Sequence, residues 1–210
     1  MQFDVDQILT IAIVILVSVS FHEAVHAFTA HWLGDPTARD LGRVTLNPFK
    51  HIDIYMSVLL PLLLIVAKLP PIFAAKPVPF NPNRVKYDEW GAALVGISGP
   101  LSNLVLAAAG AGILRLFGAQ AGIADALLIF VEVNVSLFVF NMIPFPPLDG
   151  SRLLYAVAPE PLQRLMYQIE SMGFFVLIFI LLILAPIISP VLSFVTEFFL
   201  ELLLGVNVLV

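Results

Sequence analysis

The sequence predicts an all-α polytopic membrane protein, a bundle of about five to six transmembrane helices. Of its 210 residues, 60% are hydrophobic and only 12% are charged, whereas soluble domains carry about 25% charged residues. This composition leaves too little polar material to cover a globule in water. The apolar stretches are unbroken, as in "FFVLIFILLILA", whereas a transmembrane β-barrel has segments of alternating hydrophobicity. The membrane-crossing elements are therefore predicted to be helices.

We expect the whole chain, 1–210, to form a single membrane-embedded domain, with a core over about 7–155 and accessory helices over about 168–210. The net charge of −5 is spread thinly and provides no basic patch for nucleic acid. The chain contains no cysteine. A metal site would therefore have to use His, Asp or Glu.

A helix needs roughly 20 mostly apolar residues to cross the hydrocarbon. Six stretches come near that length: about 7–33, 54–73, 91–117, 123–147, 168–186 and 190–210. The first follows Asp4 and Asp6 without a basic leader, unlike a signal peptide, so we expect it to remain in the mature protein. In the third, small residues around "GPLSN" (99–103) predict close packing against other helices. The last two are separated by a predicted break between Pro186 and Pro190.

Lys and Arg near the ends of membrane spans mark the cytoplasmic side. They follow the first, second and fourth stretches: Arg39, Arg43, Lys50, Lys76, Arg84, Lys86, Arg152 and Arg164. If all three basic segments are cytoplasmic, the N-terminus lies outside and the 54–73 stretch leaves and re-enters on one face. Pro61, Pro70 and Pro71 suit such a re-entrant hairpin. The alternative is a plain sixth crossing.

The first apolar stretch contains ionisable residues, in "SVSFHEAVHAFTAHW". Such side chains are costly in hydrocarbon and usually mark a functional site. His22 and His26 lie one turn apart on one helical face, with Glu23 beside them. Two imidazoles at i and i+4 can bind one Zn²⁺ while the adjacent carboxylate acts as a general base. The alternative is a trio of hydrogen-bonded residues that packs the bundle, and we favour zinc.

A catalytic zinc site has three protein ligands and an open position. Asp149, inside "PPLDG" at the end of the fourth stretch, is the candidate third ligand. The charge pattern makes the first and fourth stretches run in the same direction, so this carboxylate and the two histidines are expected at one depth. Asp149 also suits a turn before Gly150. Asn141 is predicted either to position a substrate carbonyl or to join helices by hydrogen bonding.

Two features of the loop after the first stretch complete the predictions. The segment 41–48 has β-like character, with Val44, Thr45 and Leu46, and can provide an edge for an extended substrate. A cytoplasmic turn is the simpler alternative. His51 is expected to make a structural hydrogen bond in this loop rather than to sense pH.

Three motifs resemble the site-2 protease family of intramembrane zinc metalloproteases: "FHEAVHA" in the first stretch, "GPLSN" at 99–103 and "NMIPFPPLDG" at 141–150. The segments "GRVTLNPFKHID" and "AKPVPFNP" resemble its short prokaryotic branch, which has no PDZ or CBS domain. The resemblance covers about 15–155. It implies one Zn²⁺ per chain held by His22, His26 and Asp149, Glu23 as the catalytic acid/base, and Asn141 as a substrate-positioning residue.

The resemblance further implies a multi-pass protein of the cell membrane whose active site opens toward the cytoplasm. Its partners would be the lipid bilayer and substrates that are transmembrane proteins or signal-peptide remnants. Two other functions remain as alternatives. One is a catalytically silent protein that binds membrane helices. The other is a metal or proton transporter, which we favour less because the ionisable residues cluster at one depth rather than along a path.

Overall fold

The computed structural model describes residues 5–51, 78–117, 123–172 and 174–205, and within these ranges the protein is helical, with no strand. Four helices are long and apolar enough to cross a membrane: α1 (Val5–Trp32), α4 (Asp88–Phe117), α5 (Ile123–Asn141) and α8 (Phe174–Leu204). Shorter elements connect them: α2 (Thr37–Asp40), the 3₁₀ turns η1 (Pro48–Lys50) and η3 (Pro82–Arg84), α6 (Gly150–Val157) and α7 (Glu160–Ser171). The prediction of an all-α polytopic membrane protein is confirmed.

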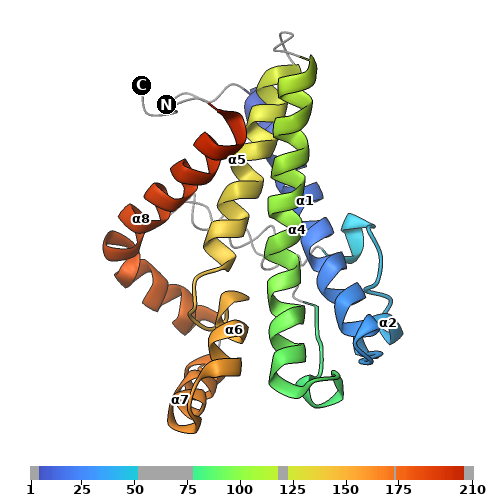
Figure 1. The fold of residues 1–210 in the computed structure, drawn as a ribbon, viewed down its shortest axis with the longest axis vertical. Coiled ribbons are helices and arrows are strands. Elements are labelled where there is room, and N and C mark those ends of the chain that lie inside the picture. Colours follow the sequence, from blue (N-terminus) through green and yellow to red (C-terminus); the bar gives the residue numbers. More distant parts are fainter. Residues whose placement is uncertain (1–4, 52–77, 118–122, 173, 206–210) are drawn as a thin grey trace.

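Helix α4 is the centre of the bundle and contacts α1, α5, α6 and α8. Figure 1 shows that α1 and α5 run in one direction, while α4 and α8 run in the other. Small side chains allow α4 to approach its neighbours closely, because its buried face is made mainly of glycine, alanine and serine. At one end of this face Ala107 and Ala111 pack with Val131 and Val135 of α5 and Leu200 of α8.

Helix α8 corrects the prediction of two separate helices at 168–186 and 190–210. Pro186 and Pro190 lie inside one continuous helix, and residues up to Ser171 belong to α7. Each proline removes a backbone donor and bends the helix, and α8 is visibly bent in Figure 1. In lipid a bend costs less than a break, because a broken helix would expose more unpaired backbone groups.

The β-like character predicted for 41–48 is wrong for the described structure, which forms turns there and then η1. Local hydrogen bonds explain the difference. The side chain of Asn47 accepts a hydrogen bond from the Phe49 N–H, and Pro48 begins the 3₁₀ turn, so the chain is capped rather than extended. The re-entrant stretch 54–73 lies outside the described residues, and its conformation remains a prediction.

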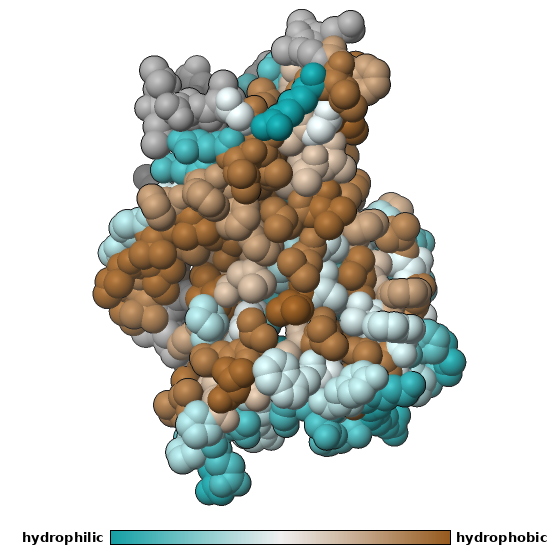
Figure 2. Space-filling model, viewed as in Figure 1, coloured by the Kyte–Doolittle hydropathy of each residue, from teal (hydrophilic) through white to brown (hydrophobic). Residues whose placement is uncertain are grey.

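One end of the protein is polar and carries the basic segments. The middle of the surface in Figure 2 is predominantly hydrophobic, and hydrophilic residues gather at the lower end. In Figure 1 that end contains α2, α7 and the first turns of α4. Trp32 and Trp90, at the end of α1 and the start of α4, are 72% and 55% exposed there, as expected for residues at a membrane–water interface.

Candidate metal centre

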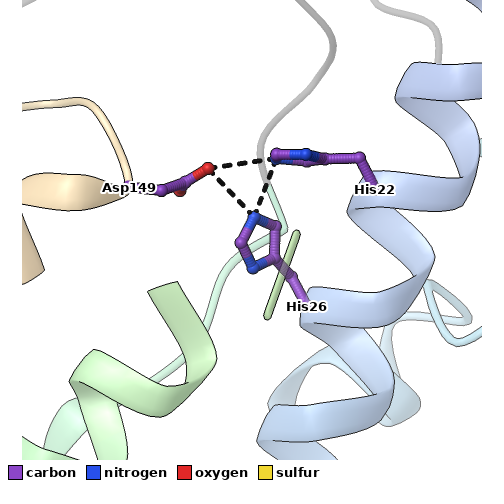
Figure 3. Close-up of side chains that lie close together, drawn as sticks. All are labelled: His22, His26 and Asp149. Atoms are coloured by element: carbon purple, nitrogen blue, oxygen red, sulfur yellow. Dashed lines mark hydrogen bonds and ion pairs between the residues drawn. The ribbon is translucent and has the colours of Figure 1, made fainter. Parts of the chain in front are cut away.

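The three residues predicted as metal ligands lie together inside the bundle. His22 and His26 project from successive turns of α1 toward Asp149 (Figure 3), and their Nε2 atoms are 2.9 Å apart. Asp149 Oδ2 is 3.0 Å from His22 Nε2 and 3.2 Å from His26 Nε2. Both histidines are buried. Each residue thus directs one ligand atom at a common point.

The backbone after α5 brings Asp149 to this point. Three prolines at 144, 146 and 147 prevent the helix from continuing beyond Asn141. Gly150 then starts α6 against the backbone of Met142 and Ile143, where a Cβ atom would lie 2.8 Å from the Ile143 carbonyl oxygen. The Asp149 side chain makes no capping hydrogen bond to α6, so its carboxylate faces the histidines instead of stabilising a turn.

Glu23 is half-buried on α1 beside the histidines. Its Oε2 accepts a 2.9 Å hydrogen bond from the backbone N–H of Val78. The sequence provided no sign of this contact, because the two residues are 55 positions apart. The irregular residues 78–81 therefore lead away from the predicted catalytic carboxylate.

Asp35 fastens this segment to the end of α1. Its carboxylate accepts two hydrogen bonds from Thr37 and one, of 2.6 Å, from the Asn81 N–H. Burial alone would raise the pKa of Asp35, but these hydrogen bonds and the positive charge of Arg84 hold the pKa below its ordinary value. Asp35 is therefore an ionised anchor for the chain that reaches Glu23.

Hydrogen bonds on the outer side of each imidazole orient the two histidines. His26 Nδ1 donates to the carbonyl of Val95, at 2.7 Å, and His22 Nδ1 lies 2.6 Å from Asn103 Oδ1. The motif "GPLSN" was predicted only to pack against other helices, and the contact of Asn103 with a histidine was not predicted. Its polar side chain within an apolar span was the signal that could have identified it.

The donor set fits a zinc ion. When both Nδ1 atoms carry protons, two imidazole lone pairs and a carboxylate oxygen face one another at 2.9–3.2 Å with no proton between them, which is repulsive without a cation. Ligand atoms about 2.0–2.1 Å from a tetrahedral zinc are about 3.3 Å apart, close to this spacing. The carboxylates of Asp149 and Glu23 also balance the charge of a divalent ion, which favours burial.

Two glycines of α4 leave the space that this cluster occupies. A Cβ atom on Gly99 would lie 2.7 Å from His22 Nε2 and closer still to His26 Nε2. On Gly96 it would lie 2.9 Å from the Asp149 carbonyl oxygen. Carbon atoms do not approach such atoms closer than about 3.5 Å without repulsion. The glycines are therefore required by the close approach of α4 to all three ligand residues.

The remaining predicted residues make hydrogen bonds to backbone carbonyl groups. Asn141 Nδ2 donates to the carbonyl of Leu137 within α5, and its role toward substrate stays a prediction. His51 is buried, and its Nε2 is 2.8 Å from the Thr45 carbonyl oxygen. This contact is the structural hydrogen bond expected for that loop.

Comparisons with known proteins identify the relatives of this chain. Residues 117–184 match the model of peptidase family M50. A Bacillus subtilis protein named "Putative zinc metalloprotease YwhC" is 37% identical over 177 residues, which cover 80% of this chain and 78% of the relative. Two proteins named "Putative zinc metalloprotease Rip2" are 32% identical, from Mycolicibacterium smegmatis, and 30% identical, from Mycobacterium tuberculosis; each comparison covers 78% of this chain and 62% of the relative. No solved structure matches the chain.

Proposed function

The chain belongs to peptidase family M50, and from this premise we propose that it is an intramembrane zinc metalloprotease that cuts within or near transmembrane segments of other membrane proteins. The observation that carries the proposal is the convergence of His22, His26 and Asp149 beside Glu23, inside helices apolar enough to cross a membrane. Such residues are costly in hydrocarbon and persist there for a function.

In this proposal His22, His26 and Asp149 hold one zinc ion, which when bound supplies a Lewis acid for a peptide carbonyl and activates water. Glu23 accepts a proton from the attacking water and delivers it to the leaving amine. The Val78 N–H holds one oxygen of Glu23, which fixes the orientation of the carboxylate. The half-buried position of Glu23 keeps it within reach of water.

The substrates that we propose are transmembrane segments of other proteins and signal-peptide remnants. The carbonyl groups of an intact helix are hydrogen-bonded within it, so a substrate must unwind locally before a carbonyl can reach the site. The basic segments at one end of the protein support an orientation in which that end faces the cytoplasm and the N-terminus lies outside. The site is then reached by water from the cytoplasmic side.

The proposal is tested with the full chain purified in detergent or liposomes and a panel of single-span substrates. We expect zinc-dependent cutting inside the apolar segment that is lost with a chelator and in Glu23→Gln, which keeps the metal and lacks the base. Glu132→Gln is the matched control, since Glu132 is exposed on α5, and it should cut normally. Wild-type protein that contains zinc and binds the substrates without cutting them would point instead to a silent helix-binding protein. Equal cutting by Glu23→Gln would refute the assigned base.

A further inference from the structure

Four buried polar groups form a chain of hydrogen bonds that ends on a predicted metal ligand. Asn134 Nδ2 donates to the carbonyl of Phe130, at 2.8 Å, and to Ser18 Oγ, at 2.9 Å. Asn103 Nδ2 donates to Asn134 Oδ1, at 2.9 Å, and Asn103 Oδ1 meets His22 Nδ1. Ser18, Asn103 and Asn134 are fully buried. This chain of hydrogen bonds joins α5, α4 and α1 through buried side chains.

The partners fix the direction of every hydrogen bond in the chain. The carbonyl of Phe130 can only accept, so the amide nitrogen of Asn134 must face it and its oxygen must face Asn103. That oxygen also only accepts, so Asn103 presents its nitrogen to Asn134 and its oxygen to His22. The opposite orientation of either amide would place two acceptors against each other in a buried site.

The direction of the chain decides the tautomer of His22. Asn103 Oδ1 can only accept, so His22 Nδ1 carries the proton and Nε2, which faces Asp149, has the lone pair that a metal requires. We propose that Asn134 and Asn103 act as a two-amide relay that holds His22 in its metal-binding tautomer. Asn103 contacts the ligand and Asn134 acts through Asn103, so both are positioning residues.

A neutral relay has a physical advantage in this place. A carboxylate as the partner of His22 would hold the same tautomer but add a third negative charge beside Asp149 and Glu23. Two carboxylates already balance a divalent ion, and an excess charge is expensive in the membrane interior. The amides therefore orient the imidazole and leave the charge of the site unchanged. This inference rests on the proposed zinc site but needs no substrate.

The relay predicts a specific set of zinc affinities in full-length protein, measured by competition with a chelator. Asn134→Leu keeps the approximate volume but removes the anchor, and zinc binding should weaken about 10–100-fold. Val131→Ala, which removes a buried side chain one turn away on α5, should lower the unfolding temperature without changing zinc affinity.

A second measurement does not depend on any relay variant. Nitrogen-15 NMR of the metal-free wild type, with His22 assigned by its absence in a His22→Gln variant, should show the proton on Nδ1. In Asn134→Leu the fraction with the proton on Nε2 should rise. A wild-type proton on Nε2, or equal zinc affinity in Asn134→Leu and wild type, would overturn the relay. Zinc affinity and the NMR tautomer are both measured without peptide cleavage. If both support the relay but the protein cuts no substrate, the proposed function is refuted and the relay is not.

Discussion

Replacing Gly99 with alanine should remove the metal while leaving the helix that carries it intact. The added Cβ atom would lie 2.7 Å from His22 Nε2 and nearer to His26 Nε2. The ordinary contact distance is about 3.5 Å, so the imidazoles or α4 must shift by at least about 0.8 Å, and by more at His26. Zinc–ligand distances tolerate only about 0.2 Å. We therefore expect zinc affinity to fall about 100-fold, equal to about 2.8 kcal/mol.

Two substitutions of the same kind in α4 serve as controls. A Cβ atom on Gly112 meets nothing within 4 Å, and Gly112→Ala should keep zinc affinity and stability. A Cβ atom on Gly110 would lie 3.0 Å from Phe130 and 3.1 Å from Val131, away from the histidines. Gly110→Ala should therefore lower stability and leave zinc affinity unchanged, which separates general crowding from damage to the site.

The assay combines zinc content per chain, chelator competition and thermal unfolding of the three variants in one detergent. The expected pattern is a loss of zinc affinity in Gly99→Ala alone. Wild-type affinity in Gly99→Ala would refute the inference that the glycine is required by the approach of α4 to the imidazoles. A similar loss of affinity in Gly110→Ala would show that crowding anywhere along α4 is sufficient.

Three further predictions concern stability. Zinc at 100 times its dissociation constant should stabilise the folded chain by about 2.7 kcal/mol. A chelator should therefore lower the unfolding temperature. An unchanged unfolding temperature would contradict a resident metal. The pKa of Asp35 is lowered in the folded protein, so its ionised carboxylate stabilises the fold fully above the ordinary carboxyl pKa of about 3.9. This stabilisation is lost as the pH falls toward the folded-state pKa. Asp35→Asn should lower the free energy of unfolding by about 1.5–3 kcal/mol at pH 7, and denaturation curves should show a weaker dependence on acid. Arg152 and Glu170 form a 2.5 Å ion pair, and their side chains are 27% and 35% exposed. Glu170→Gln should therefore lower the free energy of unfolding by less than about 1 kcal/mol. A loss of stability that is the same in high salt would contradict a solvent-screened ion pair.

The predictable part of the site follows from local geometry. His22 and His26 are four residues apart on one helix, so their shared face is determined by helix periodicity alone. The prediction that Asp149 lies at the depth of the histidines required only the direction of two membrane spans, which the basic residues indicate. Its orientation toward the histidines was not predictable, because it depends on the packing of Gly150 against the backbone of Met142 and Ile143.

The relay partners depend on how α4 and α5 are placed against α1. Asn103 and Asn134 are 31 residues apart in sequence, and the sequence alone does not show whether either faces a neighbouring helix or lipid, because the rotation and depth of each helix are not known from it.

Secondary-structure propensity also gave a wrong prediction at two places. Val44, Thr45 and Leu46 favour a strand, but the Asn47 cap and Pro48 form a turn, and the prolines of α8 bend a helix that the surrounding bilayer keeps continuous.

The order of the site along the chain sets the order in which a newly made protein acquires it. His26 is followed by Val95 after 69 residues, and His22 is followed by Asn103 after 81 residues. Asp149 comes last, 123 residues after His26, which at about 5–20 residues per second corresponds to roughly 6–25 s of synthesis. The partners that orient the imidazoles therefore enter the membrane before the third ligand. A nascent chain therefore holds two aligned histidines before the group of three ligand atoms is complete. Under the proposed function, such a chain would not yet hydrolyse its own helices or those of its neighbours during insertion.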